Sequence, residues 1–344
     1  MTHMRSVITA VLATMLLGAT AHAQTIKAED LTVPHGDGVQ IFVRNKHADG
    51  VTRFAADRIV VMMHGATYPA TAFDLPLAGK SWMDYLAERG FDVYALDLPG
   101  YGRSTRPAAM DQPPTENAPF MRTPDAAKAL GAVVDFVRAR RGVESVNLIG
   151  WSWGCGITST YAGDNPGKVG RLALYAPGWI RTTPGLIQVE GKLGAYRTVT
   201  REAALQRWLT GVPEDKKAEL IPPGWFEQWA DATFATDPKG GGNTLRAPNG
   251  VIQDSQEYWS AGKAAYDPAR IKAPVLLVVG EWDKDTPPYM AQTLFPLLVN
   301  AKWKRLVMLS EGTHTIALEK NRMLLLRTVQ QFLEEPAPGA GATQ

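Results

Sequence analysis

The run VNLIGWSWGCGITSTYA, residues 146–162, constrains the fold more than any other stretch of this chain. An apolar run enters Gly-Trp-Ser-Trp-Gly, and the residues that follow have a helical pattern. Gly150 and Gly154 flank Ser152 at a point where a strand and a helix crowd together and a Cβ atom would clash. We therefore predict a sharp strand-to-helix turn that exposes the Ser152 hydroxyl.

Short apolar runs alternate with amphipathic segments along most of the chain. Runs that are apolar on both faces are typical of buried parallel strands, and HGDG is typical of a hairpin turn between the first two strands. The sequence therefore predicts an α/β protein with a doubly wound, mostly parallel sheet that starts with an antiparallel hairpin. The predicted strands lie within residues 26–33, 39–44, 58–65, 91–104, 145–149, 171–175, 273–283 and 304–314. The predicted helices lie near residues 82–89, 123–141, 289–299 and 319–333, with Thr123 as the N-cap of the second, and a further helix is expected after Gly154.

The alternation breaks between residues 178 and 268, where amphipathic helices are expected at 201–211 and 224–235. These helices are interrupted by residues 237–250, DPKGGGNTLRAPNG. The triple glycine of this stretch is expected to be a flexible loop and not a phosphate-binding loop, because no Lys-Ser/Thr follows it. We predict a core of residues 24–177 and 269–335, an inserted helical cap of residues 178–268, and a disordered tail at 336–344.

The N-terminus predicts a cleaved signal peptide over residues 1–23: one Arg, an apolar run, then Ala-His-Ala before Gln24. A membrane anchor is the alternative, but the run is shorter than the ~20 apolar residues that span a bilayer. We expect an exported protein, periplasmic or secreted, without stable membrane insertion after cleavage. Cys155 is the one cysteine of the chain, which excludes an internal disulfide.

The charge is nearly balanced, at a formal net +2 over 344 residues, and no basic run is present. These features give no indication of a nucleic-acid partner, so we expect a small-molecule substrate. No cluster of residues suited to a metal ion is evident, and no cofactor is expected.

A serine hydroxyl needs a base to become a nucleophile. His314 follows the last predicted strand and is the expected base, whereas His35 and His47 fall in or near the first hairpin, where we expect surface positions. A carboxylate must then orient His314. The stretch GEWDKDTPP, residues 280–288, provides Asp283, with Glu281 and Asp285 as alternatives, and the stretch APGWI after the strand 171–175 contains no carboxylate.

Five stretches, MMHGAT, DLPGYGRS, GWSWG, GEWDKDTPP and GTHTIALE, resemble in residues and in order the α/β-hydrolase superfamily, in particular its serine esterases and lipases. The resemblance implies the triad Ser152, Asp283 and His314, and a cap over the active site. It further implies that Ala66, with Thr67 as the alternative, donates one oxyanion N–H and that His64 is structural. The N–H of Trp153, at the helix N-terminus, is the other expected donor.

The expected activity is hydrolysis of a carboxylic ester or lactone of a small apolar or aromatic substrate. Trp151 and Trp179 are the expected substrate contacts, although tryptophans of the insertion also suit packing between short helices. GWSWG is similar to prolyl iminopeptidases, which leaves amide hydrolysis open if a cap carboxylate such as Glu227 or Glu257 binds an amine. A non-catalytic binding protein is the third hypothesis.

Arg103, Arg106 and Arg122 precede a predicted helix near the rim of the expected site. They could bind a substrate carboxylate, but such arginines are more often solvated or paired, and we do not include them in the site.

Overall fold

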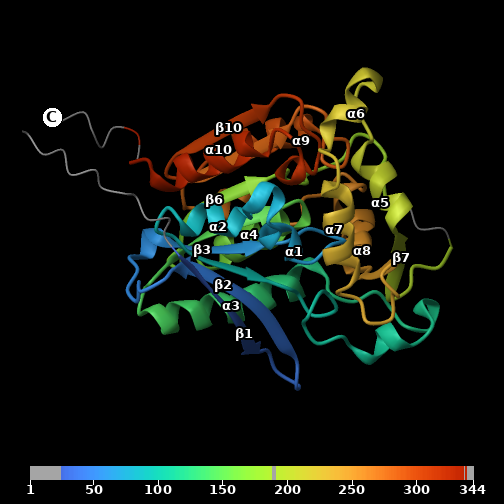
Figure 1. The fold of residues 1–344 in the computed structure, drawn as a ribbon, viewed down its shortest axis with the longest axis horizontal. Coiled ribbons are helices and arrows are strands. Elements are labelled where there is room, and N and C mark those ends of the chain that lie inside the picture. Colours follow the sequence, from blue (N-terminus) through green and yellow to red (C-terminus); the bar gives the residue numbers. More distant parts are fainter. Residues whose placement is uncertain (1–24, 188–190, 337, 339–344) are drawn as a thin grey trace, which may run out of the picture.

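An eight-stranded sheet runs through the centre of this computed structural model, which describes residues 25–187, 191–336 and 338 (Figure 1). The strand order is β1-β2-β4-β3-β5-β6-β9-β10. The first two strands form the predicted antiparallel hairpin, β2 pairs antiparallel with β4, and all later neighbours are parallel. The bounds are β1 Ile26–Pro34, β2 Gln40–Ala48, β3 Ile59–Met63, β4 Asp92–Leu96, β5 Val146–Trp151, β6 Val169–Tyr175, β9 Val275–Gly280 and β10 Lys304–Leu309. This sheet confirms the predicted α/β-hydrolase fold class.

Every residue of β3, β4, β5 and β9 is buried, because helices cover both faces of the sheet. One face packs against α3 (Thr123–Arg141), α4 (Trp153–Asp164) and α9 (Pro288–Leu294). The other packs against α1 (Thr71–Asp74), α2 (Trp82–Ala87) and α10 (Arg322–Glu334). Within the described ranges, no helix is both long and apolar enough to cross a membrane.

The segment between β6 and β9 lies at one end of the sheet (Figure 1). Its helices α5 (Arg201–Trp208) and α7 (Trp225–Phe234) agree with the predicted ones, and α6 (Lys217–Leu220) and α8 (Gly250–Asp254) are short. We refer to the described part of residues 178–268 as the cap. It is not wholly helical, since β7 (Tyr196–Thr200) and β8 (Thr244–Pro248) pair antiparallel.

The triple glycine, residues 240–242, lies in a turn that precedes β8. Asp237 accepts hydrogen bonds from the backbone N–H and the guanidinium of Arg246, which fixes the two ends of the glycine turn together. A buried carboxylate with these partners stabilises the turn that lets β8 return along β7.

Two further details differ from the predictions. Helix α3 begins at Thr123, and Arg122 is its N-cap; the Thr123 hydroxyl instead donates to Asp254 over 2.7 Å. His47 is buried, at 5% exposure, and stacks edge-on with Phe54. The predicted signal segment 1–23 lies outside the described residues, as does most of the predicted tail 336–344.

The turn between β5 and α4 is as crowded as the glycine pattern predicts. A Cβ atom on Gly154 would lie 2.4 Å from the Met63 carbonyl oxygen, and one on Gly150 would lie 2.6 Å from the Gly154 oxygen. Ser152 has φ +59° and ψ −121°, a conformation that costs a non-glycine residue about 1–3 kcal/mol. The packing of β3, β5 and α4 maintains this strained conformation.

We predict that Gly154→Ala lowers the free energy of unfolding by about 1–3 kcal/mol or more, because the new methyl group meets backbone atoms that cannot rotate away. Chemical denaturation measures this change. Gly167→Ala is the matched control, since a Cβ atom there meets nothing within 4 Å. Equal stabilities of the two variants would contradict the crowding argument.

Candidate active site

The Ser152 side chain lies at the end of β5, where its strained backbone turns it away from the sheet. Ser152 is 9% exposed, and its backbone N–H donates to the backbone carbonyl oxygen of Tyr175 at 2.9 Å. The hydroxyl thus lies beyond the carboxyl edge of the parallel strands. This is the edge at which open α/β sheets place their ligands.

His314 and Asp283 meet at the same edge, on the loops after β10 and β9. Nδ1 of His314 lies 2.8 Å from Oδ2 of Asp283, which is 1% exposed. Thr286 completes the arrangement: its N–H donates to Oδ1 of Asp283 at 2.8 Å, and its hydroxyl lies 3.0 Å from Oδ2. Nδ1 is therefore the protonated nitrogen, which leaves Nε2 free to accept a proton.

The three candidate acids have different surroundings. Asp283 contacts His314, whereas the carboxylate of Asp285 binds Arg207 and that of exposed Glu281 accepts from the backbone of Glu311. Among the sequence candidates, the geometry therefore brings Asp283 to the histidine. The spacing alone left this choice open.

The charge state of His314 follows from its neighbours. Burial opposes the imidazolium, but the carboxylates of Asp283 and Asp285 outweigh burial, so the pKa of His314 lies above its ordinary value. Its backbone is held as well, because the indole N–H of Trp151 and the hydroxyl of Tyr175 donate to the His314 oxygen at 3.0 and 2.6 Å. Trp151, an expected substrate contact, thus also positions the histidine.

The loop after β3 lies directly against Ser152. A Cβ atom on Gly65 would be 3.1 Å from the Ser152 Cβ atom, so Ala66 is placed beside the hydroxyl. His64 orients this loop: the Leu98 N–H donates to Nε2, so Nδ1 carries the proton and donates to the Gly65 oxygen at 2.8 Å. Burial lowers the pKa of His64 and keeps it neutral.

The Gly65–Ala66 peptide is trans, so the Ala66 N–H points away from the carbonyl that His64 holds. This N–H has no backbone partner within the described part of the chain. Trp153 is the first residue of α4, where a backbone N–H lacks an intrahelical acceptor and the helix dipole favours negative charge. The two predicted oxyanion donors therefore flank Ser152.

An arginine from the cap, Arg197, lies behind this loop. It donates to the Ala66 oxygen at 2.9 Å, the Thr67 hydroxyl at 2.8 Å and the Pro248 oxygen at 2.8 Å. None of the ion pairs among the described residues includes Arg197. Burial lowers its pKa to about 10, so it remains protonated at neutral pH and adds a positive charge near the predicted oxyanion donors.

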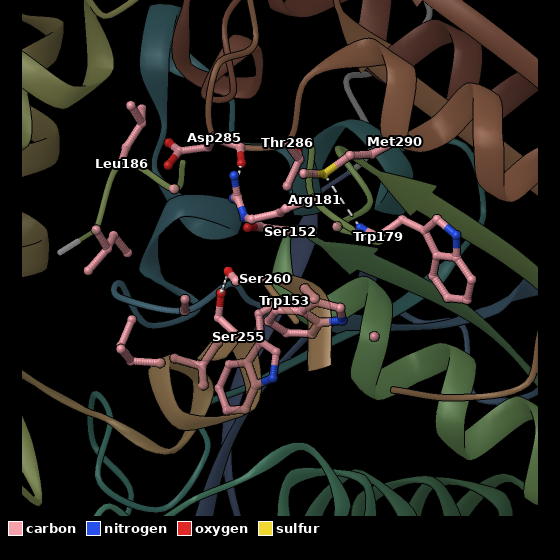
Figure 2. Close-up of a pocket in the computed structure, with 18 of the residues that line it drawn as sticks. Ser152, Trp153, Trp179, Arg181, Leu186, Ser255, Ser260, Asp285, Thr286 and Met290 are labelled. Carbon is pink, nitrogen blue, oxygen red and sulfur yellow. Dashed lines mark hydrogen bonds between the residues drawn. The ribbon is translucent and has the colours of Figure 1, made fainter. Parts of the chain in front are cut away.

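Two cavities open onto Ser152, and Ala66, Ser152, Arg207 and Asp285 line both. The Trp179 pocket, of about 130 Å³, is drawn in Figure 2; it is lined further by Trp153, Trp179, Arg181, Ile252, Trp259 and Met290. The Tyr68 pocket, of about 30 Å³, is lined further by Tyr68, Trp151, Ala204, Trp208, Trp229 and His314. Trp179 and Trp151 therefore line different pockets.

The tryptophans of the cap both line these pockets and pack against other rings. Trp208 and Trp229 are edge-on at 5.2 Å, and Trp179 meets Tyr266 at 5.1 Å. Trp225 lies outside the two pockets. The sequence left open whether these tryptophans contact substrate or pack between helices, and their positions suit both.

Arginines that the sequence analysis passed over line the site. Arg207, on α5, binds both carboxylate oxygens of Asp285 at 2.9 and 3.0 Å and therefore joins the cap to the loop after β9. Arg181 donates to the backbone oxygen of Asp285. No local pattern marks Arg181, Arg197 or Arg207 in the sequence, since their partners are distant along the chain.

The arginines that the sequence did mark are engaged elsewhere. Arg103 pairs with Asp30, Arg122 pairs with Asp254, and Arg106 donates to backbone oxygens of the surrounding loops. None of them lines either pocket. Within the described ranges, no group of three or more His, Cys, Asp or Glu side chains is placed to hold a metal ion.

The family model for the alpha/beta hydrolase fold matches residues 59–320, which include every element described at this site. The chain therefore belongs to the α/β-hydrolase fold family, and the match supports its assignment as a hydrolase.

Two curated relatives match parts of the chain. Abhydrolase domain-containing protein abhd-5.2 of Caenorhabditis elegans is 32% identical over 85 residues, 25% of this chain and 17% of that protein. A poly(3-hydroxyalkanoate) depolymerase of Ectopseudomonas oleovorans is 26% identical over 175 residues, 51% of this chain and 48% of that protein. The chain thus matches less than half the length of either relative.

Solved structures share the fold at low identity. A hydrolase from Pseudomonas aeruginosa aligns with TM-score 0.61 and 17% identity, over 89% of this chain and 98% of that one. A serine hydrolase from the polyaromatic hydrocarbon-degrading Cycloclasticus zankles aligns with TM-score 0.59 and 16% identity, over 89% of this chain and 98% of that one. An esterase from Exiguobacterium antarcticum aligns with TM-score 0.55 and 19% identity, over 88% of this chain and 99% of that one. These likenesses establish the fold alone.

We predict that Asp285→Asn lowers the pKa of His314, because it removes a carboxylate that raises this pKa and leaves Arg207 without its counter-ion. NMR titration of the His314 ring in both proteins measures the shift. Asp135→Asn, at an exposed carboxylate far from the site, is the control. An unchanged or higher pKa would contradict the electrostatic account.

Glu319 is a buried carboxylate that joins the cap to the His314 loop. It accepts from the Trp208 indole at 2.8 Å and the Thr313 N–H at 3.1 Å. Burial outweighs these hydrogen bonds and raises its pKa to about 7. The native state therefore binds more protons than the unfolded state between the unfolded pKa, near 4.5, and about 7.

The contribution of protonated Glu319 to stability is consequently full below this window and is lost as pH rises through it, by on the order of 3 kcal/mol. We predict that Glu319→Gln removes this decrease, so that the free energy of unfolding of the variant rises relative to that of the wild type between pH 5 and pH 8. Urea denaturation at both pH values tests the slope, with exposed Glu281→Gln as the control. Parallel pH profiles of wild type and Glu319→Gln would show that the carboxylate is not responsible.

Proposed function

We propose that this protein is an exported serine hydrolase that cleaves a carboxylic ester through an acyl-enzyme on Ser152. One observation carries the proposal: the His314–Asp283 pair and the Gly65–Ala66 loop meet at the strained turn that presents Ser152. Each part of this arrangement has a chemical use in acyl transfer.

The reaction follows from these positions. Nε2 of His314 takes the proton of Ser152 as its oxygen attacks the carbonyl carbon, and Asp283 stabilises the imidazolium. The N–H groups of Ala66 and Trp153 bind the oxygen that becomes negative, with the charge of Arg197 behind them. The imidazolium then protonates the leaving alcohol. Water, deprotonated by His314, hydrolyses the acyl-enzyme and regenerates the serine.

The two cavities have different places in this sequence. His314 lines the Tyr68 pocket, and the group that receives a proton from the imidazolium must lie on that side. We therefore assign the leaving alcohol to the Tyr68 pocket and the acyl group to the larger Trp179 pocket. The rings in both walls favour apolar or aromatic portions next to the ester, and a lactone would occupy both pockets.

Ester hydrolysis is favoured over the other hypotheses. A free amine would need an available carboxylate, but Asp285 is bound to Arg207, and Glu227 and Glu257 are exposed and outside both pockets. A purely binding protein has no use for a histidine that a buried aspartate orients beside a serine. The name of the depolymerase relative, whose substrate is a polyester, also supports ester cleavage.

Export is supported by residues 1–23 alone, through their charged start, apolar run and Ala-His-Ala site. Mass spectrometry of the protein recovered from the expressing cell tests this part of the proposal. We expect a mature N-terminus at Gln24, whereas an intact residue 1 in the cytoplasm would contradict it.

We predict that a fluorophosphonate probe labels the mature wild-type protein but neither Ser152→Ala nor His314→Ala. Ser159→Ala, which removes a nearby buried hydroxyl of α4, should still be labelled and serves as the control. Hydrolysis of 4-nitrophenyl acetate provides the second readout and should fall by about 10³-fold or more in both triad variants. Equal labelling of wild type and Ser152→Ala would contradict the assignment of the nucleophile.

A further inference from the structure

The Trp179 pocket holds a guanidinium with an unused donor. Nη2 of Arg181 donates to the Asp285 backbone oxygen, which is the dashed line between these residues in Figure 2. Nη1 is buried and has no hydrogen-bond partner among the described residues. A buried donor without an acceptor costs about 1–3 kcal/mol, and more when it is charged. Arg181 lines the pocket, so an acceptor on the substrate can reach this side chain.

The carboxylates near Arg181 are already engaged. Asp283 binds His314 and Thr286, and Asp285 binds Arg207 through both oxygens. No ion pair of the described chain includes Arg181. Its backbone N–H donates to the Trp259 oxygen at 2.9 Å, so the residue is anchored to the opposite part of the cap. The Arg181 guanidinium is therefore held in place, but no carboxylate among the described residues pairs with it.

The rest of the pocket is mixed. Trp153, Trp179, Ile252, Trp259 and Met290 provide apolar walls, and polar side chains, Ser152 among them, line the remainder. An acyl chain lying along these walls reaches the Arg181 guanidinium without meeting a protein carboxylate that is free to compete for it. The best partner for a desolvated guanidinium is a carboxylate, which can accept two of its N–H groups.

We infer that the Trp179 pocket selects acyl groups that end in a carboxylate, so that the preferred substrates are half-esters of dicarboxylic acids, recognised by Arg181. This inference rests on the proposed serine hydrolysis and adds the substrate class. The apolar part of the acyl chain packs against the aromatic wall, and its terminal carboxylate binds the guanidinium of Arg181. A neutral acyl group leaves the guanidinium unpaired in the closed pocket.

The test compares two esters that differ by one methyl group and therefore in charge: mono-4-nitrophenyl glutarate and its neutral methyl ester, 4-nitrophenyl methyl glutarate. Succinate and adipate pairs vary the chain length, and rates with Ser152→Ala are subtracted as the uncatalysed background. We expect wild type to prefer the anionic member of the best pair in kcat/KM by at least about tenfold. A preference for the neutral member in all three pairs would overturn the inference.

Arg181→Gln should abolish this preference mainly by raising KM for the anionic ester more than KM for the neutral ester. Arg181→Lys, which keeps the charge, should retain part of the preference. Arg103→Gln is the matched control, since Arg103 is exposed and paired with Asp30 outside the pocket. A preference that survives in a folded Arg181→Gln protein would assign the recognition to other residues and overturn the role of Arg181.

The proposed function and this inference fail in distinguishable ways. Absence of labelling and of all ester hydrolysis contradicts the proposed function. Hydrolysis of both esters without discrimination contradicts the inference alone. For an inactive protein, calorimetry with glutarate and pentanoate tests the inference. Wild type should bind glutarate more tightly than pentanoate, and Arg181→Gln should bind both ligands equally. Equal binding of the two ligands to wild type would overturn the carboxylate subsite.

Discussion

The site depends on the close approach of two turns, one after β3 and one after β5. Gly65 and Gly154 permit it, since a Cβ atom on either would meet Ser152 or the Met63 carbonyl. The parallel pairing of β3 with β5 sets this distance and therefore places the N–H groups of Ala66 and Trp153 on either side of the serine. Oxyanion stabilisation needs donors that are in place before charge develops, and here the rigid core of the sheet fixes both.

Positive charge is the second organising feature. The cap contributes Arg181, Arg197 and Arg207, while the loop after β9 contributes Asp283 and Asp285. Buried charges are retained at a cost unless they are paired, and two of these arginines have no acidic partner within the described chain. Arg197 lies behind the Gly65–Ala66 loop, and Arg181 lines the Trp179 pocket. In the proposed reaction, negative charge on the substrate would compensate both arginines.

Sequence reasoning succeeded where a local pattern carries the structure. Ser152, Asp283 and His314 each follow an apolar strand directly, so their position at one sheet edge could be predicted. Strand β8 could not be predicted, because it pairs with β7, from which α5, α6 and α7 separate it along the chain. The arginines of the site were missed for the same reason, and those near a recognisable motif, such as Arg103, are engaged elsewhere. Asp283 and Asp285 became distinguishable only through Thr286 and Arg207.

The cap and the histidine are not independent parts. Helix α5 contributes Arg207 to Asp285 and Trp208 to Glu319, and both acceptors belong to loops that flank His314. Separation of α5 from the core would expose Asp285 and remove the positive charge that offsets its effect on His314, so the pKa of the histidine would rise. The seated cap therefore limits the rise in the His314 pKa that the two carboxylates cause. The packing of α5 on the core and the pKa of His314 are thus linked through the Arg207–Asp285 ion pair.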